Sequence, residues 1–297
     1  MNGVRLDVSF LSQGETCAAW LYLPDSAKPA PVIVMAHGLG AVRAMRLDAF
    51  AERYQAAGYA CLVFDYRHFG DSAGEPRQLL DIRKQQQDWE AALDFARQCP
   101  EVDGERVVAW GSSFSGGHAL YLGATQTKLA AIMAQCPFTD GLASGLAMNP
   151  ITTAQVLPRA LADTVGSWLG WRPVMVPSAG RPFHVGLMTA PDCHDGYLAL
   201  VSSHSTFRNE VAARFALKIL LHRPGTLASA VSCPAFFAVC ARDTVAPSAA
   251  TLRHVRKAPK GQIKVYDAGH FDIYVGLHFE RVVSDQIAFL HQTVPLV

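Results

Sequence analysis

One short stretch of the chain has the residues of an activated serine. Gly111, Ser113 and Ser115 lie between an apolar run and the start of a helical pattern. This spacing is typical of a sharp strand-to-helix turn, where residues two positions from the central serine must be small to avoid collision. A serine hydroxyl can attack an acyl carbon when a neighbouring base removes its proton. We predict Ser113 as the nucleophile, because it directly follows the predicted strand.

The same pattern leaves Ser115 open as a second candidate nucleophile. The segment reads Gly-x-Ser-x-Ser rather than Gly-x-Ser-x-Gly, and Ser115 also has small residues two positions away, at Ser113 and Gly117. Short matches of this kind also arise by chance in proteins without such chemistry. The interpretation therefore depends on whether a base and an acid occur in the loops that follow later strands.

Two later loops supply candidates for that base and acid. Asp243 follows an apolar run that ends at Cys240, and His270 follows the next strand-like run. The chain order Ser, Asp, His, with each residue on the loop after a successive strand, supports a Ser-His-Asp triad. We predict that His270 is the general base and that Asp243 fixes its tautomer and stabilises the imidazolium.

Other residues compete for these roles. Asp140 follows the apolar run 130–136 and is the alternative acid, although it could instead cap a turn or a helix. Among the other histidines, His37 is expected to order a neighbouring turn by hydrogen bonding. His194 lies in a segment, 192–195, that could be taken for a metal site, but four adjacent residues cannot all point at one ion. We expect no bound metal.

The elements that must position these residues alternate along the chain. An apolar-polar alternation from Val4 to Leu23 predicts an antiparallel hairpin. Beyond it, short apolar runs alternate with helical patterns, as expected for strands buried on both faces of a parallel sheet. We predict a doubly wound α/β fold with a mostly parallel sheet of about eight strands. The expected strands are 32–36, 61–64, 107–110, 130–136, 235–240 and 262–266, and the expected helices are 47–57, 85–98, 248–256 and 277–292.

Residues 141–191 break this alternation. They contain few charged residues and are rich in proline and large apolar side chains. No strand pattern fits this stretch, and its composition is too apolar for disorder. We expect a cap over the site that extends to Arg223. The predicted domains are an α/β core of residues 1–140 and 224–297 and a cap insertion of residues 141–223.

The composition of the cap predicts the character of the pocket. Contiguous exposed apolar patches are uncommon on soluble monomers, so an apolar cap should close over the site. Trp168 and Trp171 are expected either in the core of the cap or in the pocket wall. Arg159, Arg172 and Arg181 are the candidates within the cap for holding a substrate carboxylate. We expect a hydrophobic or aromatic acyl group as the substrate.

Composition and charge exclude several classes of partner. The 297 residues carry a formal net charge of +1, so no basic field is available to attract nucleic acid. The first ten residues lack the apolar stretch of a secretion signal, and no later run is long enough to span a membrane. The seven cysteines occur singly, which argues against disulfides and a zinc site. We expect a soluble cytoplasmic protein.

On these motifs the chain resembles the α/β-hydrolase superfamily, and more narrowly its dienelactone-hydrolase and Xaa-Pro-peptidase-like members. The resemblance covers nearly the whole chain, and the segments 37–40, 65–72 and 103–107 also resemble motifs of this superfamily. It implies an α/β-hydrolase fold with an inserted cap, no cofactor, and an oxyanion hole made by the backbone N–H groups of Leu39 and Phe114. The apolar insertion resembles no member closely enough to indicate a substrate.

Three functions remain open at this point. The first is hydrolysis of a carboxylic ester, lactone or thioester with a hydrophobic acyl part, through an acyl-enzyme formed on a small-molecule substrate. The second is a small-substrate peptidase or amidase, although no acidic cluster is evident to hold a substrate amino terminus. The third is a catalytically silent binding protein of the same fold, which would not need all of Ser113, Asp243 and His270. A homo-oligomer is compatible with any of these functions.

Overall fold

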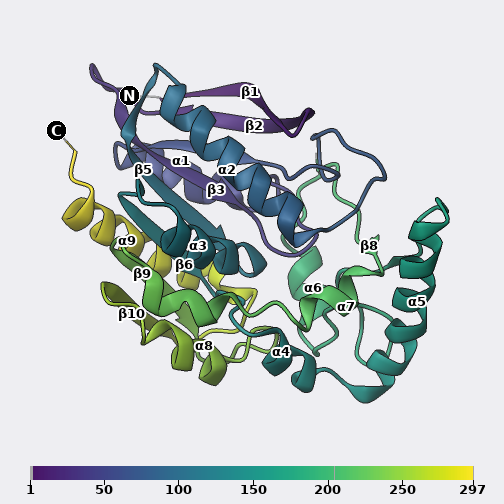
Figure 1. Cartoon of the computed structure of the whole chain (residues 1–297). Helices are drawn as coiled ribbons and strands as arrows, with labels where there is room; N and C mark the ends of the chain where they lie inside the picture. Colours follow the sequence, from purple (N-terminus) through teal and green to yellow (C-terminus); the bar gives the residue numbers. More distant parts are fainter. Residues whose placement is uncertain (1–2, 204, 297) are drawn as a thin grey trace.

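Eight strands form one twisted sheet in the computed structural model, which describes residues 3–203 and 205–296 (Figure 1). The strand order is β1-β2-β4-β3-β5-β6-β9-β10. The pairs β1–β2 and β2–β4 are antiparallel, and the other neighbours pair in parallel. The mostly parallel eight-stranded sheet predicted from the sequence is therefore confirmed. The strands are β1 (Val4–Ser12), β2 (Glu15–Leu23), β3 (Ala30–Ala36), β4 (Ala60–Phe64), β5 (Val102–Ser112), β6 (Ala131–Gln135), β9 (Ala235–Cys240) and β10 (Gly261–Tyr266).

Helices cover both faces of this sheet, with α2 in front of it and α1 behind it in Figure 1. The helices α2 and α3 pack against β5, whereas α1 packs against β4 and against α9. Every residue of β3, β4, β6 and β9 is buried, which explains why these strands are continuous apolar runs in the sequence. The flanking helices are α1 (Leu47–Ala56), α2 (Ile82–Gln98), α3 (Phe114–Thr125), α8 (Ser248–Val255) and α9 (Gly276–Thr293).

Most predicted elements agree with the structure to within two residues, and two differ by more. The helix α2 begins at Ile82 rather than at Gln85, because the Asp81 carboxylate accepts two backbone N–H bonds in the first turn and caps the helix earlier. The strand β5 begins at Val102 rather than at Val107, since its first residues pair with β3 before a shift in register. Both differences lengthen elements whose existence was predicted correctly.

The chain between β6 and β9 forms a group of helices beside the carboxyl edge of the sheet (Figure 1). The two-residue strands β7 (Met175–Val176) and β8 (Val211–Ala212) pair within this group, so the expectation of no strand in 141–191 is wrong at β7. Two residues that pair across such a long sequence separation leave no local alternation from which to predict them. The helices are α4 (Gly141–Ala147), α5 (Pro150–Trp168), α6 (Cys193–Leu198), α7 (Phe215–Ile219) and the 3-10 helix η1 (Pro224–Ala230); a second 3-10 helix, η2 (Asp272–Tyr274), precedes α9.

Candidate active site

Ser113 lies in a strained turn between β5 and α3. Its backbone has φ 57° and ψ −119°, and non-glycine residues rarely adopt a positive φ. The turn is held on both sides, because the N–H of Ser113 donates to the carbonyl of Gln135 at 2.8 Å and its carbonyl accepts from the N–H of Gly116 at 2.9 Å. A Cβ added at Gly111 would lie 2.0 Å from the carbonyl oxygen of Ser115. The close approach of strand and helix therefore requires the glycine found there.

His270 and Asp243 meet Ser113 at the carboxyl edge of the sheet, on the loops that follow β10 and β9. The Nε2 atom of His270 lies 2.9 Å from Ser113 Oγ, and Nδ1 lies 2.8 Å from Asp243 Oδ2. The second carboxylate oxygen of Asp243 accepts from the N–H groups of Val245 and Ala246 at 2.9 and 2.7 Å. The structure thus brings the three predicted residues into one hydrogen-bonded chain with a fixed carboxylate at its end.

The environment of His270 sets both its protonation and its tautomer. Burial of the imidazole acts to lower its pKa, but the Asp243 carboxylate and other negative groups nearby together outweigh burial and raise the pKa of His270 to about 9. The same carboxylate attracts the proton of Nδ1, which leaves Nε2 of the neutral ring as an acceptor that faces Ser113. In that tautomer the ring can accept the proton of the serine hydroxyl.

The two backbone N–H groups predicted as oxyanion donors lie beside Ser113. Phe114 is the first residue of α3, Leu39 lies in the turn after β3, and both line the same cavity as Ser113. Neither N–H donates to another of the described residues. An N–H at the first turn of a helix also carries part of the positive end of the helix dipole. Within the described chain, neither N–H group is therefore taken up by another acceptor.

His37 holds the turn that carries Leu39. Its Nδ1 accepts from the N–H of Gly38 at 2.7 Å, and its Nε2 donates to the carbonyl of Met45 at 2.8 Å. Burial lowers the pKa of His37 to about 4, so the ring is neutral and uses one nitrogen as donor and the other as acceptor. These contacts agree with the expected ordering role of His37.

The alternative nucleophile and the alternative acid do not join this site. The hydroxyl of Ser115 is buried in the core, 2.7 Å from a buried tyrosine hydroxyl. Asp140 caps α4 through Oδ1, and its Oδ2 accepts from Arg223 at 3.0 Å and lies 3.1 Å from Nε2 of His254. In the described chain neither Ser115 nor Asp140 forms a hydrogen bond with His270.

Two other histidines, His118 and His194, have hydrogen-bond partners of their own. His118 pairs with Gln85 at 3.0 Å inside the core, and His194 pairs with Asp195 at 2.7 Å in the first turn of α6. Across residues 3–203 and 205–296, no three His, Cys, Asp or Glu side chains are grouped so that they could hold a metal ion.

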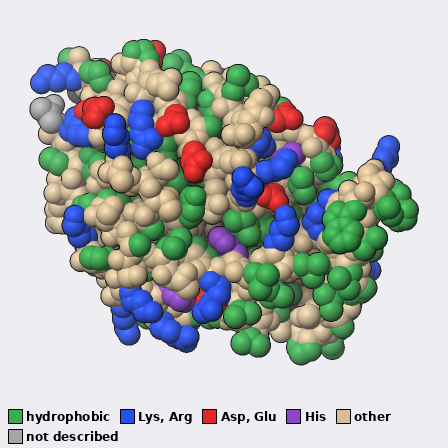
Figure 2. All heavy atoms as spheres, in the orientation of Figure 1, with side chains coloured by type: hydrophobic (Ala, Val, Ile, Leu, Met, Phe, Trp, Pro, Cys, Tyr) green, Lys and Arg blue, Asp and Glu red, His purple; other side chains and the backbone are tan. Residues whose placement is uncertain are grey.

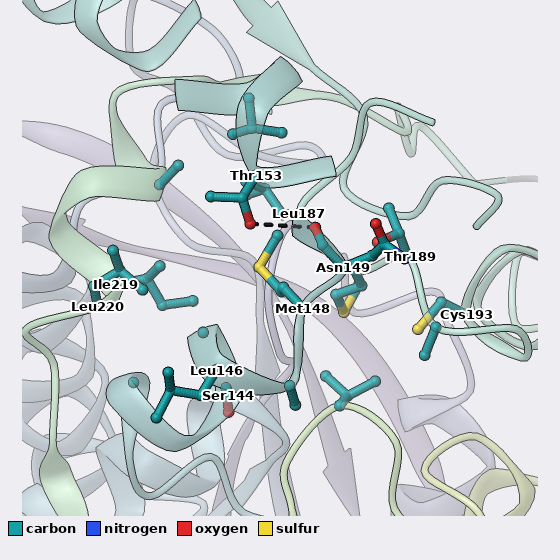
Figure 3. A pocket seen from close by; sticks show the side chains of 18 of the residues that line it. Ser144, Leu146, Met148, Asn149, Thr153, Leu187, Thr189, Cys193, Ile219 and Leu220 are labelled. Carbon is teal, nitrogen blue, oxygen red and sulfur yellow. Dashed lines mark hydrogen bonds between the residues drawn. The ribbon is translucent and has the colours of Figure 1, made fainter. Parts of the chain in front are cut away.

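A large cavity opens beside Ser113, with a volume of about 1020 Å³. Side chains from α4, α5 and α7 and from the stretch before α6 face into it, and Figure 3 shows Leu146, Met148, Leu187 and Ile219 around the open space. None of the described residues that line it is charged. A cavity of this kind suits an uncharged, mostly apolar group. The polar lining side chains are those of Ser113, Ser144, Asn149, Thr153, Thr189 and Thr244.

The arginines and tryptophans singled out in the 141–191 stretch do not line this cavity. Arg159, Arg172 and Arg181 are exposed residues outside the lining. Trp168 and Trp171 also lie outside it, with 79% and 66% of their surfaces exposed. The expectation that the apolar residues of this stretch close over the site is therefore wrong in part, because some of them face the cavity and others face solvent.

Tyr197, on α6, is a residue near the site that sequence reasoning missed. Its buried hydroxyl donates to the carbonyl of Leu39 at 2.8 Å. Burial raises the pKa of Tyr197 far above its ordinary value, so the hydroxyl remains a donor. In the same turn Gly40 has φ 66°, and a Cβ there would lie 2.5 Å from Ser178 Oγ. The turn is thus packed closely against residues that are distant in the sequence, which local patterns do not reveal.

The same short helix also contacts the loops that follow β9 and β10. Asp192, directly before α6, accepts from the hydroxyl of Thr244 at 2.6 Å, on the loop after β9. Gly196 packs on Phe271, on the loop after β10, where a Cβ at the glycine would lie 2.8 Å from the ring. The helix α6 and its first flanking residue therefore touch all of the loops that carry Leu39, Asp243 and His270.

Comparison with known proteins identifies the family. Residues 14–172, more than half of the chain, match the family model described as X-Pro dipeptidyl-peptidase (S15 family). The chain belongs to the S15 family. This confirms the predicted resemblance to α/β-hydrolase-fold serine hydrolases of the Xaa-Pro-peptidase-like type.

Relatives of this S15-family chain match nearly its whole length. The quorum-quenching protein AidA of Acinetobacter baumannii (strain MDR-ZJ06) is 56% identical over 98% of this chain and 96% of its own length. The thiohydrolase aneE of Aspergillus aculeatus is 27% identical over 97% of this chain and 93% of its own. The crystal structure of the alpha/beta hydrolase GrgF from Penicillium sp. has a TM-score of 0.82 at 24% identity, and covers 98% of this chain and 99% of that one. The S15-family chain has the α/β-hydrolase fold and is a hydrolase.

Proposed function

We propose that this hydrolase cleaves carboxylic esters, lactones or thioesters that carry a hydrophobic acyl group, with Ser113, His270 and Asp243 as its catalytic residues. The observation that carries the proposal is the hydrogen-bonded Ser-His-Asp chain at the wall of an uncharged cavity of about 1020 Å³. The names of two relatives, a quorum-quenching protein and a thiohydrolase, are compatible with small acyl substrates.

Acylation would begin at Ser113 Oγ. Neutral His270 accepts the hydroxyl proton on Nε2, 2.9 Å away, as Oγ bonds to the acyl carbon, and the carbonyl oxygen becomes an anion. Asp243 stabilises the imidazolium that forms and holds the ring in place. The imidazolium then returns its proton to the leaving oxygen or sulfur as the bond to the acyl carbon breaks. The products of this half-reaction are an acyl-serine and a free alcohol or thiol, or an acyl-serine with a tethered hydroxyl when the substrate is a lactone.

Stabilisation of the anionic oxygen would come from the N–H groups of Leu39 and Phe114, which have no other acceptor in the described chain. Removal of one donor of this type typically costs about 10²–10³ in rate. Deacylation repeats the sequence with water: His270 takes a proton from the water, hydroxide adds to the acyl carbon, and the proton passes to Ser113 as the acid departs.

The segment 141–223 would act as a cap that provides the acyl-binding wall, on a core of residues 1–140 and 224–297. Two facts support this division of roles. Most of the side chains that line the cavity come from α4, α5, α7 and the stretch before α6, whereas Ser113, Asp243 and His270 all follow strands of the large sheet. The cap would select the acyl group, and the core would perform the chemistry.

A peptidase function is the second candidate, because the family description names X-Pro dipeptidyl-peptidase. An enzyme that binds a free amino terminus needs a carboxylate or a comparable acceptor for the ammonium group. None of the described residues that line the cavity is Asp or Glu, so the cavity favours an uncharged acyl group instead. An X-Pro-p-nitroanilide should therefore be a poor substrate compared with a p-nitrophenyl ester of similar size.

Covalent labelling tests the assignment of the nucleophile. A fluorophosphonate probe should label the wild-type chain and the Ser115→Ala variant, and Ser113→Ala should lose labelling together with at least about 10³ of kcat. The matched variant is informative because Ser115 is two residues away and buried in the core. Retention of labelling in Ser113→Ala, with loss in Ser115→Ala, would show that the wrong serine has been assigned.

A substrate panel tests the acyl preference. Each methylene buried in an apolar cavity contributes roughly 0.8 kcal/mol, so kcat/KM should rise about fourfold per added CH₂ until the cavity is full. The panel would include p-nitrophenyl esters from acetate upward, an acyl thioester, N-acyl homoserine lactones of increasing length and a succinyl-type charged ester. A flat series, or a preference for the charged ester, would contradict the proposed hydrophobic specificity.

A further inference from the structure

The outer side of α5 carries an apolar stripe that no described element covers. Leu157, Leu161, Val165 and Trp168 follow one another at helical spacing and lie on one side of the helix. Their exposed fractions are 45%, 50%, 49% and 79%. The opposite side of α5 is buried against the rest of the segment, where it packs on α7 and β7. The helix therefore has an apolar side that is free for contact with something outside the chain.

This stripe begins inside the cavity. Thr153 and Leu157 line the cavity, and the next residues along the same side, Leu161 and Val165, continue toward the exposed end of α5. On α4, Leu146 also lines the cavity and is 87% exposed. Figure 2 shows hydrophobic side chains gathered over α5, and Figure 1 shows that helix at the edge of the molecule. One apolar surface thus runs from the cavity to the end of the helix.

The size of this surface is comparable with the largest apolar patch that a monomer usually exposes. Trp168 and Trp171 alone expose roughly 300 Å², given their exposed fractions and the 150–250 Å² typical of a large aromatic side chain. The largest apolar patch on a typical monomer covers only about 300–600 Å² and is often functional. The leucines and the valine of the stripe add further exposed apolar area. A surface of this size is best explained as a site that binds another molecule or a membrane.

The charges around the stripe indicate what binds there. In the 141–191 stretch the exposed charged side chains are Arg159, Arg172 and Arg181. Arg159 is two residues from Leu157 and so lies on another side of α5 than the stripe. Arg181 lies 3.9 Å from the exposed carboxylate of Asp195, whereas Arg172 is next to Trp171. The acidic residue of the same stretch, Asp163, is buried and accepts hydrogen bonds from Arg214, one of them at 2.7 Å. The exposed surface around Trp168 and Trp171 is therefore apolar, and beside it lies the Arg172 guanidinium, which forms no ion pair within the described residues. This combination suits an anionic lipid surface.

We propose that α5 docks on the surface of an anionic membrane, with Trp168 and Trp171 inserted among the lipid headgroups. No helix of residues 3–203 and 205–296 could cross a bilayer, so the contact is limited to the membrane surface. Because the stripe starts in the cavity, an acyl chain dissolved in the bilayer could reach Ser113 along it. That route rests on the proposed function, but membrane binding itself does not.

Vesicle co-sedimentation tests the docking without any hydrolysis. The Ser113→Ala variant, which has an intact surface, should bind vesicles of equal phosphatidylcholine and phosphatidylglycerol and bind pure phosphatidylcholine vesicles much less. Trp168→Ser with Trp171→Ser in that background should lower the partition coefficient at least about tenfold. The control pair Leu11→Ser with Leu277→Ser, which are 70% and 76% exposed elsewhere on the molecule, should leave binding unchanged.

Tryptophan fluorescence gives an independent measurement. Trp89 and Trp110 are fully buried and Trp20 is partly buried, whereas Trp168 and Trp171 are exposed. A blue shift of the emission on addition of anionic vesicles, lost in the double tryptophan variant, would therefore report insertion of the exposed pair. Absence of both binding and blue shift with anionic vesicles would overturn the proposal. So would a dimer, seen by light scattering, that the double tryptophan variant dissociates, because the stripe would then bind a second copy. Either result would leave the esterase and labelling experiments unaffected, so the two proposals fail separately.

Discussion

Asp243 and Asp140 follow neighbouring strands of the sheet, β9 and β6, but they have different partners. Asp243 contacts the imidazole of His270, and Asp140 contacts Arg223 and the ring of His254. Two carboxylates at similar places in the fold thus have different roles. The partner decides the role: His270 for Asp243, and Arg223 with His254 for Asp140.

Replacement of Asp243 by Asn should slow the proposed reaction and also change its pH dependence. The amide can stabilise the wrong tautomer of His270, so kcat should fall by up to about 10⁴. The general base acts when neutral, so a pKa raised to about 9 places the acidic limb of the wild-type kcat/KM profile near that pH, with activity that increases as pH rises through it. Without the carboxylate the pKa should fall, and the limb should move toward lower pH.

Asp140→Asn is the matched control for that experiment. It removes a carboxylate of similar burial that does not contact His270, so it should affect stability and leave the acidic limb of the profile in place. The measurement is kcat/KM from pH 5 to 10 on a p-nitrophenyl ester, corrected for spontaneous hydrolysis. A profile that moves in Asp140→Asn and not in Asp243→Asn would reverse the assignment of the acid.

The short helix α6 connects the parts of the proposed site that the large sheet does not connect. It contacts the turn of Leu39 through Tyr197, the loop after β9 through Asp192 and the loop after β10 through Gly196. Loops at the edge of a sheet are otherwise free to move independently. We therefore expect α6 to fix the position of the oxyanion donors relative to Ser113.

Tyr197→Phe tests this expectation, with Tyr59→Phe as its control. Both tyrosines are buried and donate to a backbone carbonyl, Tyr197 to Leu39 at 2.8 Å and Tyr59 to Val294 at 2.9 Å. Both variants should therefore lose about 1 kcal/mol of stability in urea denaturation. Only Tyr197→Phe should also lower kcat, by about tenfold, which is less than the loss of a direct oxyanion donor, with KM nearly unchanged. Equal kcat values in the two variants would reduce Tyr197 to a structural residue.

The fold was predictable because its signals are local. Continuous apolar runs of five or six residues mark the strands that are buried on both faces, as in β4 and β9. The helix α5 was not predicted, since Pro158 lies inside it and proline ordinarily ends a helix. Burial of its inner side on α7 and β7 explains why the helix continues through that proline.

The candidate site was predictable only in part, for a related reason. Ser113, Asp243 and His270 each follow a recognisable strand, so their types and order indicated a site before any geometry was known. Tyr197 has no such signal, because its partner Leu39 is 158 residues away. The same applies to the direction of the apolar side chains of α5: composition indicates that they are many, but only the packing decides which of them face the cavity.

At the scale of the whole molecule, the 141–223 segment begins and ends at the same place, because its two ends are hydrogen-bonded to each other and to neighbouring residues. Gly141 N–H donates to the carbonyl of His222 at 2.9 Å, and Arg223 donates to the Asp140 carboxylate at 3.0 Å. Burial acts to raise the pKa of Asp140, but hydrogen bonds from His254 and Arg223 outweigh it and hold that pKa below its usual value. The contacts of Gly141 with His222 and of Asp140 with Arg223 therefore form one joint, through which the segment connects to the rest of the chain.

Arg223→Ala should weaken that joint. The buried carboxylate of Asp140 would lose its cationic partner, and we expect a loss of about 1–3 kcal/mol in the free energy of unfolding. Arg242→Ala removes an exposed pair, with side chains 59% and 81% exposed, and should cost no more than about 0.5 kcal/mol. Urea denaturation measures both values, and limited proteolysis should cut within 141–223 first in Arg223→Ala. Equal stability of the two variants would contradict a structural role for the joint.

That joint also has a consequence for how substrate range could change in evolution or by grafting. The two ends of this segment already lie next to each other. It can therefore be exchanged for a segment of different length without moving the strands that flank it, because any replacement needs to span only the same short distance. The helix α6 limits this freedom, because Tyr197 and Asp192 support loops of the core. A transplanted segment would therefore need to bring equivalent contacts with it, and exchange confined to α4 and α5 should be tolerated more readily than exchange of all of residues 141–223.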